Sequence, residues 1–179
     1  MRVMSRRPID AGIDAGGPDE PPPEGVSADA FREAMSRWAA GVTVVAVRDA
    51  GTVHATTVSS FGSVSADPPL TVISLGANAQ VLPFLQEGRR FVVNVLAESQ
   101  RRLASVFADS FPVGPSPFPE DGDPVIPDAL ARIVCSVQRV VPAASSRLVL
   151  GLVVEAHEGP EGRPLLYWRR DYRELSPDS

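Results

Sequence analysis

Residues 54–74 read HATTVSSFGSVSADPPLTVIS and contain two apolar, β-branched runs joined by a loop that ends in Asp67, Pro68 and Pro69. Such runs favour strands, and a strand that ends in a hydroxyl-rich turn offers backbone amides and hydroxyls, which form a polar ligand-binding surface with no formal charge. The same hydroxyls could instead satisfy their own turn. Both interpretations stay open for this hydroxyl cluster, which comprises Thr56, Thr57, Ser59, Ser60, Ser63 and Ser65.

Short β-branched runs recur along the rest of the chain and are joined by turns. This pattern favours an antiparallel barrel over βαβ units, which need long crossover connections. The fold is therefore expected to be mainly β with flanking helices. We expect strands from Thr52 into the hydroxyl cluster and over residues 42–47, 61–65, 70–75, 91–96, 132–141, 147–155 and 165–168, and helices over 28–40, 80–87 and 98–108.

The expected helix at residues 28–40 is amphipathic. Ser27 can cap its N-terminus, and its apolar side chains recur at helical spacing. We expect this apolar face, which comprises Phe31, Ala34, Met35 and Trp38, to pack on the barrel.

Residues 109–128 are rich in proline, aspartate and glycine. A loop of this length in a compact domain is usually a lid, a binding loop or a disordered segment. Phe111 and Phe118 could cover an apolar ligand.

The composition argues against several classes of function. The chain has 179 residues, 44% of them hydrophobic, and a formal net charge of -5, and its 17 basic residues are all arginine. No basic stripe could neutralise phosphates and no apolar run approaches a membrane span, so we expect neither a nucleic-acid nor a membrane partner. The His and Cys spacing predicts no metal site, and Cys135 is expected to be a buried structural residue rather than a nucleophile.

The first 26 residues are rich in proline, glycine and aspartate. We expect a disordered tail at residues 1–26, one domain over residues 27–175, and a cytoplasmic location.

Four segments together resemble the flavin reductase family, the FMN-binding split β-barrels that supply reduced flavin to two-component monooxygenases. They are FREAMSRWAAGVTVVAVRD at 31–49, HATTVSSFGSVSADPPL at 54–70, FVVNVLAESQRRLASVFA at 91–108 and RPLLYWRRDYREL at 163–175. The resemblance implies an antiparallel, Greek-key-like split β-barrel. It also implies FMN or FAD, NAD(P)H as cosubstrate, a partner oxygenase and a homodimer with its site at the subunit boundary.

The resemblance also assigns candidate pocket residues. In the family the flavin ring lies against the segment that corresponds to residues 54–61, where amides and small hydroxyl side chains hold its polar edge. Thr57 and Ser60 match the family pattern Thr-Ala-Asn-Ser, whereas Val58 and Ser59 replace its Ala and Asn. Phe61 completes this part of the candidate pocket.

Two family motifs are degenerate in this chain. Residues 77–81 replace an Arg-Ser-Ser-Arg-Thr-like phosphate-binding run, and only Asn78 and Gln80 can donate hydrogen bonds there. Residues 144–146 replace the Gly-Asp-His turn that places the nicotinamide, so that Ser146 stands in the position of the histidine. Lost charge-assisted bonds to a phosphate predict weak or absent FMN binding.

Two functions therefore stay open. The first is an NAD(P)H-dependent reductase of FMN or FAD. The second is a cofactor-independent enzyme on the same fold, in which the vacated flavin pocket binds an apolar natural product and catalyses a redox-neutral cyclisation or rearrangement. A non-catalytic flavin-binding module is a third alternative. The candidate catalytic residues are His54 and Tyr172, and Asn94, a polar residue inside an apolar strand, either ties down backbone or faces a ligand.

Overall fold

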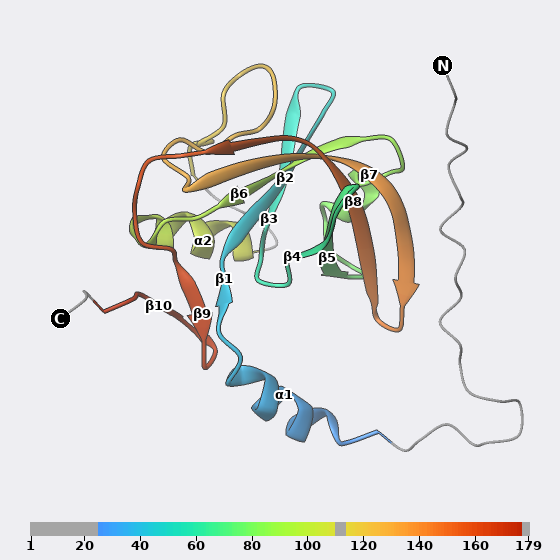
Figure 1. The fold of residues 1–179 in the computed structure, drawn as a ribbon, viewed down its shortest axis with the longest axis vertical. Helices are drawn as coiled ribbons and strands as arrows, with labels where there is room; N and C mark the ends of the chain where they lie inside the picture. Colours follow the sequence, from blue (N-terminus) through green and yellow to red (C-terminus); the bar gives the residue numbers. More distant parts are fainter. Residues whose placement is uncertain (1–24, 110–113, 177–179) are drawn as a thin grey trace, which may run out of the picture.

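The computed structural model describes residues 25–109 and 114–176. Seven antiparallel strands form one sheet in the order β3-β2-β6-β7-β8-β5-β4, and three short strands form a second sheet in the order β1-β9-β10 (Figure 1). The mainly β, antiparallel prediction is confirmed. The strands are β1 (Ala40–Gly41), β2 (Thr43–Asp49), β3 (Thr52–Val58), β4 (Gly62–Ala66), β5 (Pro69–Gly76), β6 (Arg90–Val95), β7 (Ala131–Ala143), β8 (Ser146–Glu158), β9 (Leu166–Trp168) and β10 (Asp171–Arg173). The helices are α1 (Ala28–Ser36), α2 (Arg101–Ala108) and the 3-10 turns η1 (Leu82–Phe84) and η2 (Glu98–Gln100).

The seven-stranded sheet is open. Its edges are β3 and β4, and no strand pairing joins them within the described residues. The sheet of the expected antiparallel barrel is therefore not closed within the described residues. A single hydroxyl spans part of the gap, because Ser60 Oγ donates to the Ser74 carbonyl at 2.7 Å and accepts from the Ser74 amide at 3.1 Å. The segment after β3 is thus tied to β5 by a side chain rather than by a strand ladder.

Both faces of β2 are buried, which explains its continuous apolar run. Val45 and Val47 belong to a core that also contains Phe91 of β6 and Ile73 of β5. Val44 faces the opposite way, into a second core that is covered by α2. Strand β2 therefore joins the interior of the sheet to the helical layer.

Helix α1 does not pack on the sheet as its amphipathic pattern suggested. Phe31 is 57% exposed and Trp38 is 71% exposed, so the apolar face is open within the single chain. The helix lies at the periphery (Figure 1) and is held at its C-terminal end, where Trp168 Nε1 donates to the Arg37 carbonyl at 3.1 Å. The prediction that this face packs on its own barrel is wrong, because periodicity reports an apolar face but not what covers it.

Other element boundaries differ from those expected. The helix expected over residues 80–87 is only the turn η1, since Pro83 lacks an amide proton and Gly88 has a φ of 82°. The helix expected over 98–108 starts as the 3-10 turn η2 before α2. Strands β7 and β8 extend beyond the expected 132–141 and 147–155 and pair along most of their length, with bulges that absorb two register shifts.

The described part of the proline-rich loop, residues 114–128, is pinned to the sheet. Arg48 of β2 donates through Nε to the Gly122 carbonyl at 2.8 Å and through Nη2 to the Pro119 carbonyl. Phe118 stacks at a tilt against Phe107 of α2, with ring centroids 5.4 Å apart. These contacts make the described part a fixed element of the fold.

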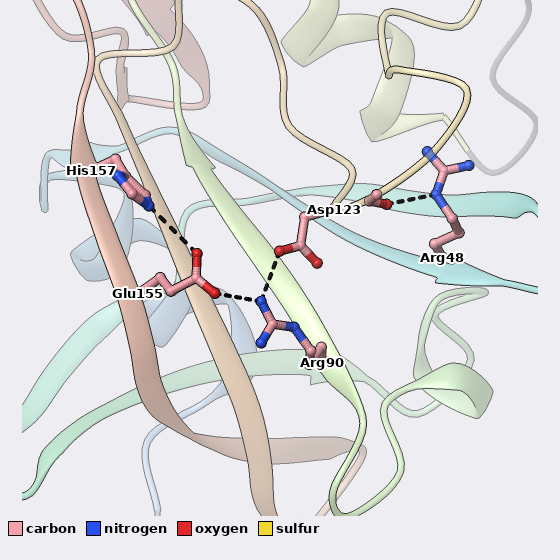
Figure 2. A network of polar contacts seen from close by, with 6 residues as sticks. Arg48, Arg90, Asp123, Glu155 and His157 are labelled. Atoms are coloured by element: carbon pink, nitrogen blue, oxygen red, sulfur yellow. Dashed lines mark hydrogen bonds and ion pairs between the residues drawn. The ribbon is translucent and has the colours of Figure 1, made fainter.

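An ion-pair network holds the same loop from the other side (Figure 2). Arg90 of β6 lies between Asp123 of the loop, at 2.9 Å, and Glu155 of β8, at 2.8 Å. Hydrogen bonding from Arg90 holds the pKa of Glu155 below its usual range. His157 contacts the same carboxylate at 3.5 Å, and its side chain is 45% exposed.

Two sequence predictions fall largely outside the described residues. The tail predicted over 1–26 lies outside them except for Gly25 and Val26, and Phe111 also lies outside them.

Candidate functional site

A hollow of about 160 Å³ lies beside β3, the edge strand of the open sheet. Its wall combines residues 53–56 of β3, residues 78–81 after β5, and Ala108 and Asp109 at the end of α2. An edge strand leaves alternate backbone amides and carbonyls without a strand partner. The hollow therefore offers backbone hydrogen-bonding groups together with the side chains of Asn78 and Gln80.

His54 lies in this wall, stacked on Phe84 of η1. The two ring centroids are 3.6 Å apart and the ring planes differ by 13°. Strand alternation turns His54 to the same side as the buried Val58, where Phe84 packs on the first core. Within the described residues the structure records no hydrogen bond to the imidazole nitrogens, so the ring presents free polar atoms beside a flat apolar surface.

A second hollow of about 220 Å³ adjoins the first and shares Ala108 with it. Thr57, Ser59 and Tyr172 line this hollow together with Val42 and Tyr167. The Tyr172 ring meets Tyr167 edge-on at 5.7 Å, and burial raises the pKa of its phenol. A phenol with a raised pKa stays protonated at neutral pH and can donate a hydrogen bond or a proton.

The predicted pocket residues therefore divide into three groups. His54, Asn78 and Gln80 line the first hollow, and Thr57, Ser59 and Tyr172 line the second. The others, Val58, Ser60, Phe61, Asn94 and Ser146, line neither hollow.

Several of the predicted hydroxyl donors are already used inside the fold. Thr57 Oγ1 donates to the Ala104 carbonyl of α2 at 2.7 Å, and Ser60 is bonded to Ser74. Val58 is a core residue, and Phe61 packs against the same core. For Thr57 and Ser60 the structure therefore favours the interpretation that the hydroxyls form hydrogen bonds within the fold rather than with a ligand.

Asn94 has an equally structural position. It is 0% exposed, and its amide donates to the carbonyls of Val44 and Pro124, each at 3.2 Å. Its Oδ1 accepts from the amide of Ile126 at 2.8 Å. Asn94 thus ties down backbone, the first of its two alternatives, and the pocket assignment is corrected.

Ser146 lies near the first hollow without lining it. The turn at residues 144–146 contacts the loop after β5, because the amide of Ala77 donates to the Ser145 carbonyl at 2.9 Å. Ser146 itself pairs with Gly76 across the two strands. The degenerate nicotinamide turn is therefore close in space to the degenerate phosphate run.

Sequence reasoning missed some lining residues because their role depends on strand order. Val53 and Ala55 have apolar side chains, and their position at a sheet edge follows only from the fact that β3 pairs with β2 on one side and, within the described residues, with no strand on the other. Tyr167 falls within the strand expected over residues 165–168, and a strand pattern does not indicate which of its side chains line a hollow. For Ala108 the sequence does contain a signal, because the amphipathic pattern of α2 ends at this residue. Both hollows meet there.

The sequence from residue 35 to residue 176 matches the family model described as "Flavin reductase like domain". This chain belongs to that family. The prediction of the flavin reductase family from four sequence segments is confirmed. A match of this length covers both hollows and the whole seven-stranded sheet.

Curated relatives and solved structures agree with the family match. The chain is 37% identical over 151 residues to the reductase component of 4-hydroxyphenylacetate 3-monooxygenase from Thermus thermophilus, covering 82% of this chain and 96% of the relative. It is 38% identical over 168 residues to the NADH:riboflavin 5'-phosphate oxidoreductase of Streptomyces pristinaespiralis, covering 90% and 96%. The structure of flavin reductase PheA2 in its native state superposes with a TM-score of 0.77 at 36% identity, covering 85% of this chain and 100% of that one.

A third relative is named as a dimerase rather than as a reductase. The actinorhodin polyketide dimerase of Streptomyces coelicolor is 36% identical over 150 residues, covering 81% of this chain and 85% of the relative.

Other chemistries find little support in the described residues. Cys135 is 0% exposed, and desolvation raises the pKa of its thiol, as expected for a structural cysteine. Among the residues that the structure describes, no group of three or more His, Cys, Asp or Glu side chains could hold a metal ion. No helix in the described ranges is both long enough and apolar enough to cross a membrane.

Proposed function

We propose that this chain is an NADH-dependent flavin reductase whose reduced flavin serves a partner oxygenase. The observation that carries the proposal is the hollow at the open edge of β3, on a chain that belongs to the flavin reductase like domain family. Relatives named as reductase components of monooxygenases support the assignment of a partner oxygenase. A cytoplasmic location stays a prediction.

The residues of the first hollow suit a flat, polar-edged ring. Backbone groups of residues 53–56 can hydrogen-bond to the ring edge, and the stacked pair of His54 and Phe84 provides a planar surface. A flavin held there would be reduced by hydride from NADH and would leave as reduced flavin, which supplies electrons to the oxygenase. The task of the protein is to position the ring and to exclude water from one of its faces, which is how proximity lowers the barrier.

The small size of the hollow suits a flavin that binds and leaves. Sites that enclose a drug-sized ligand usually measure about 300–1,000 Å³, whereas the first hollow measures about 160 Å³. One chain therefore covers only part of a flavin. Incomplete enclosure favours release, which a reductase that hands its product to another protein requires.

Turnover with a pocket-filling variant tests the proposal. We expect the wild-type protein to oxidise NADH in the presence of flavin, as followed by loss of NADH absorbance. Asn78→Trp places an indole in the hollow and should raise the flavin KM by about tenfold, equivalent to about 1.4 kcal/mol. The matched control is Gln138→Trp, because Gln138 is exposed on β7 outside both hollows.

Two results would contradict this function. One is the absence of turnover above the uncatalysed rate with riboflavin, FMN and FAD, each tried with NADH and NADPH. The other is an equal rise in flavin KM for both tryptophan variants, which would place the flavin elsewhere.

A homodimer completes the proposal, with a second copy covering the apolar face of α1. Phe31, Met35 and Trp38 form a groove with Tyr167 and Trp168 of β9. The helix is held in place by backbone bonds such as Arg169 N to the Ser36 carbonyl at 2.8 Å, so its apolar face is preformed. A rigid, exposed apolar patch of this kind is typical of a protein interface.

Light scattering can test the dimer. We expect the wild-type protein to have twice the chain mass, and Phe31→Ser with Trp38→Ser to reduce the mass to that of one chain, because two exposed apolar anchors are lost. The control is Val64→Ser, since Val64 is 54% exposed on β4, away from α1. A wild-type monomer, or a doubly substituted protein that stays dimeric, would contradict this interface.

The redox-neutral alternative keeps one supporting observation. The second hollow places the protonated phenol of Tyr172 beside Thr57 and Val42, which is a site that could hold and protonate an apolar substrate. The relative named as a polyketide dimerase is compatible with natural-product chemistry but is a weaker support. Turnover of NADH in the assay above would favour the reductase.

A further inference from the structure

The first hollow has no arginine or lysine in its wall. Its wall consists of residues 53–56, residues 78–81 and the end of α2. The polar side chains at the loop after β5 are uncharged, and Asp109 adds a carboxylate. Within the described residues, therefore, an anionic group in this hollow would meet no arginine.

The arginines nearest to the wall in the strand ladders are engaged elsewhere. Arg48 lies opposite Val53 in the β2–β3 pair, and its guanidinium donates to the carbonyls of Gly51, Pro119 and Gly122. Arg147 lies opposite Leu75 at the end of β5, and its Nη1 donates to the Ser146 carbonyl at 2.9 Å. Neither side chain lines the hollow.

Helix geometry does not replace the missing cations. The turn η1, which follows the loop after β5, has three residues, too few for an anion-binding N-terminus. The formal net charge of -5 adds a field that opposes anions at low ionic strength. The ring and the phosphate of a flavin therefore differ in what this site offers them. The ring meets the edge amides of β3, whereas the phosphate meets His54, the amide side chains of Asn78 and Gln80, and a carboxylate, with no arginine or lysine.

From this charge distribution we infer that the site selects a flavin with an uncharged side chain, and that riboflavin binds at least as tightly as FMN. This inference rests on the proposed flavin function and names the substrate class for the same site. The inferred preference for riboflavin would distinguish this chain from the relative that is named for riboflavin 5'-phosphate. The discriminating element is the loop at residues 77–81.

Fluorescence titration of riboflavin and of FMN, at low and at high salt, measures this selection. For the wild-type protein we expect the riboflavin Kd to be equal to or lower than the FMN Kd. Repulsion between a phosphate and an acidic site is screened by salt, so FMN should bind more tightly as salt rises while riboflavin should not change. Attraction by a cation would reverse that salt dependence.

A new cation in the loop should restore phosphate recognition. Asn78 and Gln80 are exposed and line the hollow, so Asn78→Arg and Gln80→Arg can be made without disturbing the core. Each should tighten FMN binding by about tenfold through a charge-assisted hydrogen bond and leave riboflavin unchanged. The matched control, Gln138→Arg, adds the same charge on β7 and should leave the FMN to riboflavin ratio as in the wild type.

Arg147→Met tests whether that arginine supplies the phosphate contact instead. An unchanged FMN to riboflavin ratio supports the inference, and a selective loss of FMN affinity overturns it. The inference is also overturned by wild-type FMN binding that is tighter than riboflavin binding and weakens with salt, although NADH turnover would then leave the reductase function standing. Binding of no flavin at all by the folded protein would overturn both proposals.

Discussion

Replacing Asn94 with alanine is expected to lower the free energy of unfolding by about 3 kcal/mol, since an unpaired buried polar group typically costs about 1–3 kcal/mol. The amide of Asn94 is fully buried and bonds three backbone groups, on Val44, Pro124 and Ile126. After truncation these groups lose this partner at a site away from solvent. Urea unfolding, followed by circular dichroism, measures the change.

Asn78→Ala is the matched control, because it makes the same truncation at an exposed residue of the first hollow. It should change stability by less than about 0.5 kcal/mol and affect only flavin binding. A stable Asn94→Ala protein that has lost flavin affinity would show that Asn94 faces the ligand, contrary to its observed bonds.

The position of Asn94 also links the loop to the site. Its bond to Ile126 holds a residue of the second core, which packs against Ala104 and Phe107 of α2. Helix α2 ends at Ala108, the residue common to both hollows. Asn94→Ala should therefore affect flavin binding only indirectly, through the position of α2. We expect the change in the free energy of flavin binding to be smaller than the change in the free energy of unfolding.

Local signals were sufficient for the longer strands, whereas the short strands β1 and β10 were not expected from the sequence. The run at residues 42–47 predicted β2, observed at Thr43–Asp49, because both faces of this strand are buried and its sequence is apolar throughout. Composition also distinguished short sequential strands from βαβ units. These features depend on neighbours in the sequence, so the sequence alone determines them.

The site could not be predicted as completely, because its contacts join distant parts of the chain. A hydroxyl such as Ser60 Oγ can serve a ligand or a backbone group equally well, and only the approach of Ser74 decides between them. The stacking of His54 on Phe84 depends on how the loop after β5 returns to β3. The exposed face of α1 is a similar case, since the helical pattern is the same whether a sheet or another chain covers it.

Gly159→Ala is expected to destabilise the fold by on the order of 3 kcal/mol, at the upper end of the usual cost of overpacking. A Cβ at this position would lie 1.8 Å from the carbonyl oxygen of Ala129. No rotamer change can relieve a clash with backbone, and the amide of Gly159 donates to the Leu130 carbonyl at 2.8 Å. To accommodate a methyl group, the chain must separate the ends of β7 and β8, where Ala131 pairs with Glu158.

Gly162→Ala is the control for this prediction. Its Cβ would meet only the Leu130 Cδ2 atom at 3.0 Å, the end of a flexible side chain that can move aside. Thermal unfolding of the two variants should therefore show a large decrease in Tm for Gly159→Ala and a small one for Gly162→Ala. Equal melting temperatures would mean that the strand ends separate at little cost, and that the register at Ala131 and Glu158 does not depend on this close approach.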